Sequence, residues 1–291
     1  MSARARPPLA RRRVLAAVAA LTLPGALMSR ARAADLAPLV VGVLPNISAR
    51  VLFANYEPLV TYLQRSTRRM VELTTAPNFR EFHQRTLRGD YDLVVTSPNL
   101  ARLAEVDAGM VGLATYEPGI EALAVTTRAQ PIKSVDALRG KKLALANPQS
   151  LVALSGLAWL RENGLAEGKD FATVHAPNDD SLGVALRSGE SPLAIMSGPE
   201  FRNIQPAVRD ELEVYNAFAR VPGFCVLAKA AERGGRPDLL RTLILAFPAS
   251  AEGRQFRATT GVEGIRPLAD ADRAAVEPYV ELTRQRLAGP N

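Results

Sequence analysis

Short apolar runs alternate with amphipathic stretches along most of the chain. Residues 40–44, 70–75 and 92–96 are continuous apolar or alternating runs, as in strands. Between them, apolar side chains recur at helical spacing after Asn55 and again from Phe79 to the helix-ending Gly89. This order of strand, helix, strand, helix and strand predicts an α/β fold with a parallel or mixed sheet covered by helices.

The middle of the chain departs from this order. Residues 111–115 and 122–127 are two strand-like runs with no helical pattern between them, so we expect the chain to pass here from one lobe to another. Further strands are then predicted at 143–146, 170–175, 192–196, 213–216 and 224–228, and helices at 134–140, 150–164, 180–188, 237–247, 251–258 and 269–287.

Two α/β lobes joined by two extended crossings would form a hinge with a cleft that closes on a small ligand. We expect the crossings near residues 116–119 and 220–223. The predicted division is an export segment at 1–33, lobe 1 at 34–120, lobe 2 at 121–219, and a return to lobe 1 with C-terminal helices at 220–291.

The strand–turn–helix unit at 141–164 is the strongest candidate for a binding element. Its breaker Asn147-Pro148-Gln149 precedes Ser150, which is placed to cap the next helix. A helix N-terminus presents unpaired backbone N–H groups and the positive end of the helix dipole, which favours anions. Ser97-Pro98-Asn99 follows an earlier strand in the same way. For both turns the alternative is a purely capping role.

The formal charge of +7 belongs to the N-terminal end of the chain. Seven of the 36 basic residues are arginines within residues 1–33, which hold no acid, so 29 basic and 29 acidic residues remain. The remainder is neutral and offers no basic stripe with interleaved aromatics, which argues against a nucleic-acid partner.

Residues 1–33 have the pattern of an export signal. Basic Arg11-Arg12-Arg13 is followed by an apolar segment from Val14 to about Met28, and Ala31-Arg32-Ala33 suits a signal peptidase. We predict a cleaved signal peptide and a periplasmic location. The twin-arginine route, which Arg11-Arg12-Arg13-Val14-Leu15 would fit, and the ordinary secretory route both remain open.

Catalytic or metal chemistry has little support in the sequence. Cys225 is the only cysteine, and His83 and His175 stand far apart with no second ligand at helical spacing. With no nucleophile–base pair and no nucleotide-binding glycine motif, we expect neither an enzyme nor a cofactor or metal. Cys225 is expected to be a buried strand residue. The alternative is a thiol that binds a soft oxyanion such as arsenite or senses redox state.

Several blocks carry a family resemblance across nearly all of the chain after the signal. They are the segments 56–63, 88–93, 134–143 running into Asn147-Pro148-Gln149-Ser150, and 185–189. In these blocks the chain resembles the phosphate/phosphite/phosphonate type of periplasmic substrate-binding proteins of ABC transporters. The resemblance implies a type II periplasmic-binding-protein fold in which each lobe is a mixed sheet flanked by helices. It also implies a monomer that delivers a small oxyanion to a membrane permease.

The resemblance is weaker at the expected ligand contacts. Members of the family usually continue the turn as Ser-Thr-Ser-Gly, whereas Ser150 is followed here by Leu-Val-Ala. Phe79, Ile120, Asp179 and Phe224 stand where the family often has two tyrosines, a histidine and an acid. Fewer polar donors predict a less polar ligand, or one held mainly by backbone N–H groups.

The candidate ligand-binding residues combine polar groups at turns with an aromatic wall. They are Ser97, Asn99, Asn147, Ser150, Asn178, Asp179, Glu200, Phe79, Tyr116 and Phe224. Capping or core packing is the alternative for each. For the whole chain, the alternatives to solute uptake are a ligand-sensing partner of a sensor kinase, an exported hydrolase, and an interaction module whose cleft binds nothing tightly.

Overall fold

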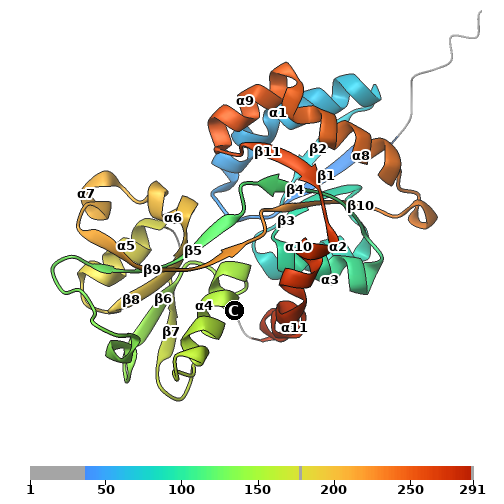
Figure 1. The fold of residues 1–291 in the computed structure, drawn as a ribbon. Coiled ribbons are helices and arrows are strands. Elements are labelled where there is room, and N and C mark those ends of the chain that lie inside the picture. The colour runs from blue at the N-terminus through green and yellow to red at the C-terminus, as the bar shows by residue number, and fades with distance from the viewer. Residues whose placement is uncertain (1–36, 177–178, 290–291) are drawn as a thin grey trace, which may run out of the picture. The chain divides into compact units, whose positions relative to one another are not determined.

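A computed structural model describes residues 37–176 and 179–289, all within one compact unit, Leu36–Asn291 (Figure 1). The predicted signal peptide and Asn178 lie outside the described residues. The described strands form two mixed sheets, one of six strands and one of five. We call the first sheet with its helices lobe A and the second with its helices lobe B.

The sheet of lobe A has the order β11-β4-β10-β3-β1-β2. β1 (Leu39–Val43) lies parallel to β2 (Val71–Thr74) and β3 (Leu93–Thr96). β10 (Cys225–Ala228) runs antiparallel to β3 and to β4 (Val111–Glu117), and β11 (Gly264–Pro267) pairs with β4. One of the inner strands, β10, therefore comes from the C-terminal part of the chain and lies between β4 and β3.

Both faces of this sheet are covered, which explains its continuous apolar strands. Leu93 and Val95 face a cluster with α1 (Ala49–Thr67), α8 (Pro237–Ala246) and α9 (Ala251–Thr260). Val94, between them, faces α2 (Phe79–Arg88) and α3 (Pro98–Ala108). Figure 1 shows these two helix layers on opposite sides of the sheet. Gly42 leaves room for the ring of Tyr91, whose atoms would lie 2.6 Å from an added Cβ.

The sheet of lobe B has the order β7-β6-β8-β5-β9. β6 (Lys142–Leu145) is parallel to β7 (Ala172–His175) and β8 (Leu193–Ser197), and β5 (Ile120–Thr127) is antiparallel to β8 and to β9 (Leu212–Val221). α4 (Leu151–Glu162) covers one face. α5 (Asp179–Arg187) and residues around α6 (Gly198–Asn203) cover the other. The short α7 spans Pro206–Arg209.

Two backbone crossings join the sheets, one from β4 to β5 and one from β9 to β10. They lie side by side, because the backbone N–H of Tyr116 donates to the carbonyl of Phe224 at 2.8 Å and the Thr115 hydroxyl donates to that of Gly223 at 3.1 Å. This paired crossing connects lobe A, with the turn that follows β3, to lobe B, with the turn that follows β6.

Several elements differ from those predicted from the sequence. Helix α1 begins at Ala49, before Asn55, and carries Pro58 inside it. The stretch predicted as one helix at 269–287 is broken by a 3-10 turn at Glu277–Tyr279 into α10 (Asp270–Val276) and α11 (Val280–Ala288). The predicted helix at 134–140 is a 3-10 turn, Val135–Leu138. Among the described residues, no helix is both long enough and apolar enough to cross a membrane.

Candidate ligand site

The turn from β6 into α4 is held by its own side chains. Asn147 Oδ1 accepts from the backbone N–H of Gln149 at 2.9 Å, and Ser150 Oγ accepts from that of Ala153 at 3.1 Å. Ser150 is therefore the N-cap of α4, as predicted. Its hydroxyl proton is not used in that bond and can be donated to another acceptor. The first N–H groups of α4 also have no acceptor within the helix.

The matching turn of lobe A starts α3 but is more deeply buried. Ser97 is the N-cap residue, yet its hydroxyl makes no capping bond and donates instead to Asn99 Oδ1 at 2.9 Å. Asn99 is fully buried, with 0% of its surface exposed. The side chains of Ser97 and Asn99 are therefore engaged inside the protein.

Asn99 connects the two turns. Its Nδ2 group donates to the carbonyl oxygen of Gln149 at 2.9 Å and to Thr283 Oγ1 at 3.1 Å. Gln149 belongs to the α4 turn of lobe B, and Thr283 to the C-terminal helix α11. One buried amide thus joins helix starts from both lobes, and a small anion near α4 would lie next to this contact.

Tyr116 and Phe224 lie at the paired crossing. Tyr116 is buried, packs edge-on against Phe256 at a ring distance of 5.8 Å, and its hydroxyl interacts with that of Tyr56. Burial raises the pKa of Tyr56 to about 12 and that of Tyr116 well above its usual value, so both stay neutral. Phe224 is half-buried, which leaves it the more accessible of the two crossing aromatics.

Cys225 follows directly on the crossing and is buried, with 2% of its surface exposed. Burial raises the pKa of its thiol to about 12, so it is protonated at neutral pH. The cavity beside it, between α3 and α10, measures only about 10 Å³. These surroundings favour the packing role predicted for Cys225 over a thiolate that binds arsenite.

The other predicted residues have identifiable structural surroundings. Phe79 is buried in the cluster between α2 and the sheet of lobe A. Glu200 forms a capping box with Ser197, accepting from its backbone N–H at 2.5 Å. Asp179 is the first residue of α5. Whether any of these residues contacts a ligand stays a prediction.

Neither described histidine lies in surroundings that suggest catalysis or metal binding. Burial lowers the pKa of His83 to about 4, which keeps that side chain neutral. His175, at the end of β7, is exposed. Among residues 37–176 and 179–289, no three His, Cys, Asp or Glu side chains gather as a metal site would require.

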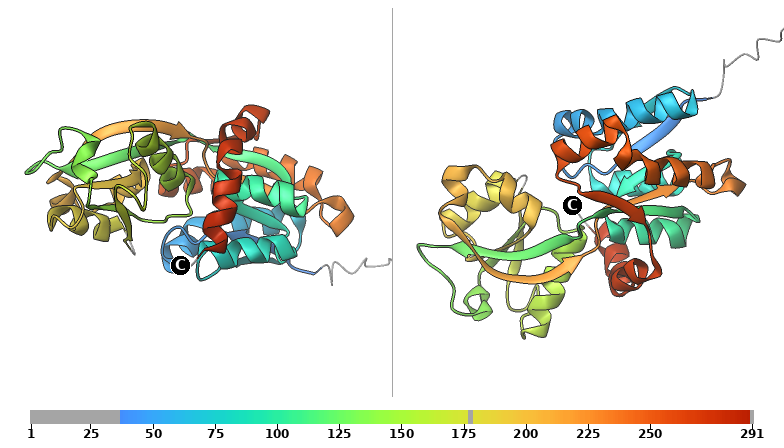
Figure 2. Two further views of the ribbon diagram at one scale, coloured as in Figure 1. Left: turned by 90° about the horizontal axis from the view of Figure 1, so that it is seen from below. Right: turned by 45° about the horizontal axis from the view of Figure 1, so that its top comes forward.

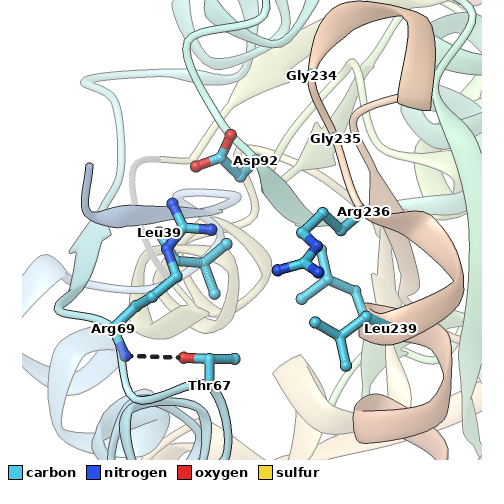
Figure 3. A pocket seen from close by; sticks show the side chains of 9 residues that line it. Leu39, Thr67, Arg69, Asp92, Gly234, Gly235, Arg236 and Leu239 are labelled. Atoms are coloured by element: carbon cyan, nitrogen blue, oxygen red, sulfur yellow. Dashed lines mark hydrogen bonds between the residues drawn. The ribbon is translucent and has the colours of Figure 1, made fainter. Parts of the chain in front are cut away.

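A separate cavity of about 60 Å³ lies at the opposite end of the lobe A strands from Ser97 (Figure 3). Arg69, Asp92 and Arg236 border it, at the end of the sheet where β1 and β3 begin. Ser97 instead follows the other end of β3. This cavity therefore lies away from the two helix starts.

Sequence reasoning missed the residues that tie the helix starts together. The sequence pattern marks Gln149 only as part of a breaker, and Thr283 and Arg286 only as part of a helix. Gln149 Nε2 donates to the carbonyl oxygen of Arg286 at 3.5 Å, and Arg286 forms an ion pair with Glu167. These contacts join positions more than a hundred residues apart, and no local pattern signals them.

The fold, with two mixed sheets, a paired crossing and helix starts from both lobes beside it, is that of type II periplasmic binding proteins. The sequence model described as "ABC transporter, phosphonate, periplasmic substrate-binding protein" matches residues 41–273. The chain therefore belongs to this family of periplasmic substrate-binding proteins, as the sequence blocks predicted.

Solved structures agree with this fold. A Xanthomonas citri protein bound to chloride ion is 21% identical, with 86% of this chain and 98% of that chain covered and a TM-score of 0.73. A binding-protein component of an ABC phosphonate transporter from Pseudomonas aeruginosa is 18% identical, covering 87% and 88% of the chains, with a TM-score of 0.72. PhnD1 from Prochlorococcus marinus, in complex with methylphosphonate, is 14% identical, covering 86% and 98%, with a TM-score of 0.71.

Proposed function

We propose that this protein captures a small oxyanion of the phosphonate or phosphate type, or a related small organic solute, between its lobes. It then delivers that solute to the permease of an ABC transporter. The observation that carries this proposal is the bond from Asn99 to the Gln149 carbonyl, which brings the starts of α3 and α4 together from opposite lobes. Helix starts supply N–H donors and positive potential, which suit an anion.

The main proposed ligand contacts are groups whose hydrogen-bond donors are not used elsewhere in the described part of the protein. The Ser150 hydroxyl proton and the first N–H groups of α4 are the proposed anion donors, with Asn147 beside them. Asn178, Asp179 and the half-buried Phe224 are the further proposed contacts. Ser97 and Asn99 hold the turns, while Phe79, Tyr116 and Glu200 support the site from the core or from a cap.

The apolar residues after Ser150 set the proposed ligand class. Leu151 and Val152 are buried and carry no hydroxyl, so the site offers an anion few side-chain donors. Each hydrogen bond to a charged group contributes roughly 1.5–3 kcal/mol. A compact oxyanion with a small apolar substituent, held mainly by backbone N–H groups, suits this arrangement best.

The rest of the assignment follows the family. The proposed mature protein begins near Ala34 after export, with lobe 1 at 34–120, lobe 2 at 121–219 and the return at 220–291. We infer a monomer without catalytic activity. In reconstituted membranes, ligand-dependent ATP hydrolysis by the ABC transporter would support delivery. Ligand-dependent autophosphorylation of a sensor kinase would support sensing instead.

A thermal-shift screen of the chain from Ala34 tests the proposal. The panel comprises phosphate, phosphite, methylphosphonate, a small alkylsulfonate and a small carboxylate. A ligand at a hundred times its dissociation constant stabilises by about 2.7 kcal/mol. For a chain of this size that raises the melting temperature by roughly 5 to 10 °C. No shift with any of these anions would contradict the proposed capture of an oxyanion.

A further inference from the structure

The C-terminal helices contact both lobes. We call residues 270–288, comprising α10, the 3-10 turn and α11, the C-terminal strap. Val276 and Tyr279 pack into the apolar cluster of lobe B that includes α4. Leu287 packs into the cluster of lobe A between the sheet, α2 and α3. Figure 2 shows the strap, in dark red, at the junction of the two sheets.

Polar contacts reinforce the hold of the strap on lobe B. Arg286 pairs with Glu167, and both side chains are about three-quarters buried, at 27% and 26% exposed. The hydroxyl of Thr173, on β7, donates to Glu167 Oε1 at 2.8 Å and so orients the carboxylate toward its partner. An ion pair shielded in this way resists screening by salt better than an open surface pair.

Other contacts fix the strap to lobe A. Arg284 pairs with Asp107 at 2.9 Å, and Arg102 pairs with Glu277 at 2.7 Å. Asp107 and Arg102 both lie on α3. Thr283 is fully buried and accepts the hydrogen bond from Asn99. The strap therefore has separate attachments to each lobe.

We propose that this strap holds the α4 turn in the ligand-receiving position and that Asn99 is the positioning residue at its centre. Asn99 binds the turn and the strap with one amide group, and Gln149 returns a bond to the strap. Separation of lobe A from lobe B at this point breaks the bond from Asn99 to Gln149, and with the strap held on lobe A it also breaks the pair of Arg286 with Glu167. The inference rests on the proposed function in placing the ligand at the α4 turn.

The strap thereby raises the fraction of molecules that are ready to bind. The apparent dissociation constant of a ligand equals the intrinsic constant divided by the binding-competent fraction. A variant that lowers this fraction tenfold weakens apparent binding tenfold without altering any atom that touches the ligand. Its effect is therefore visible before ligand is added.

Spin-label distances test the proposal directly. Glu57→Cys on α1 and Val184→Cys on α5 place labels on exposed positions of the two lobes, while the native Cys225 is buried. In the mature chain without ligand, Asn99→Ala and Arg286→Gln are expected to shift the distance distribution toward longer values. Arg65→Gln, which removes an ion pair with Glu252 inside lobe A and outside the strap, is the matched control and should leave the distribution unchanged.

Two further measurements keep the test sharp. If Asn99→Ala fails to fold, Arg286→Gln alone decides, since its site is partly exposed. Arg286→Glu combined with Glu167→Arg should restore the original distribution. Unchanged distances in folded Arg286→Gln, or an equal shift in Arg65→Gln, would overturn the proposed role of the strap. Methylphosphonate titration then separates the two proposals, because the ligand-free distances can support the strap even where no phosphonate binds.

Discussion

A Cβ atom added to Gly223 would lie 2.1 Å from the carbonyl oxygen of Tyr116, closer than any side chain tolerates. The two crossings between the lobes therefore pack backbone to backbone at this point. We expect Gly223→Ala to force the crossings apart, with a loss of at least about 1–3 kcal/mol in the free energy of unfolding.

Denaturant unfolding of Gly223→Ala beside Gly264→Ala checks this prediction. At Gly264 the added Cβ would meet only the flexible end of Glu117 at 3.2 Å, so the control should unfold close to wild type. Similar losses in the free energy of unfolding of the two variants would contradict the prediction that the close approach at the crossing is what makes Gly223→Ala destabilising.

Ser150→Ala should weaken ligand binding as well as remove a helix cap. Loss of the cap costs about 1 kcal/mol of stability. Loss of a hydrogen bond to an anion costs roughly 1.5–3 kcal/mol, or about a tenfold to hundredfold rise in the dissociation constant. Ser250→Ala, which removes the cap of α9 in lobe A, is the control. It should lower stability similarly and leave affinity unchanged, and matched affinity losses would contradict the assignment of Ser150.

Stability should depend on pH through His83. Its folded pKa is about 4, below the ordinary value of 6.5, because burial disfavours the charged imidazole. Between these values the unfolded chain binds the proton and the folded chain does not. The stability that His83 contributes is thus present above pH 6.5 and lost as pH falls toward 4, by roughly 3 kcal/mol. His83→Gln should flatten the pH dependence of the unfolding free energy over this window, and an unchanged pH dependence would contradict the role given to His83.

The thiol of Cys225 should be inert in the folded protein. Its pKa of about 12 and its burial predict negligible reaction with a disulfide reagent at pH 8, followed by full reaction in guanidinium chloride. Arsenite should accordingly leave the melting temperature unchanged. Rapid labelling of native protein, or an arsenite shift that Cys225→Ser abolishes, would instead support a functional thiol.

Most of the fold could be predicted because most helices and strands are marked by nearby residues, such as an apolar run or a helix cap. The apolar run before Asn147 and the cap at Ser150 define β6 and α4 without reference to distant residues. The four residues of β11 lack such a signal, because Gly264 and Pro267 bound only two intervening positions. The strand forms because β4 offers an open edge, a condition set by tertiary structure.

The site was less predictable for the same reason. The turns around Ser97 and Ser150 could be found from strand–turn–helix order, which is local. The connection between these turns could not be found in this way. Asn99 bonds to Gln149, 50 residues later in the sequence, and to Thr283, 184 residues later. The break at Pro278 in the helix predicted at 269–287 does have a local signal, because a proline inside a helical pattern interrupts the helix.

Calorimetric titration of the chain from Ala34 with methylphosphonate, phosphate and a small alkylsulfonate, each repeated with Ser150→Ala, is the most direct test of oxyanion capture at the α4 turn. We predict saturable binding of one ligand per chain for at least one of these anions, weakened about tenfold to a hundredfold in the variant. An absence of binding by all three, or binding that Ser150→Ala leaves unchanged, would contradict it.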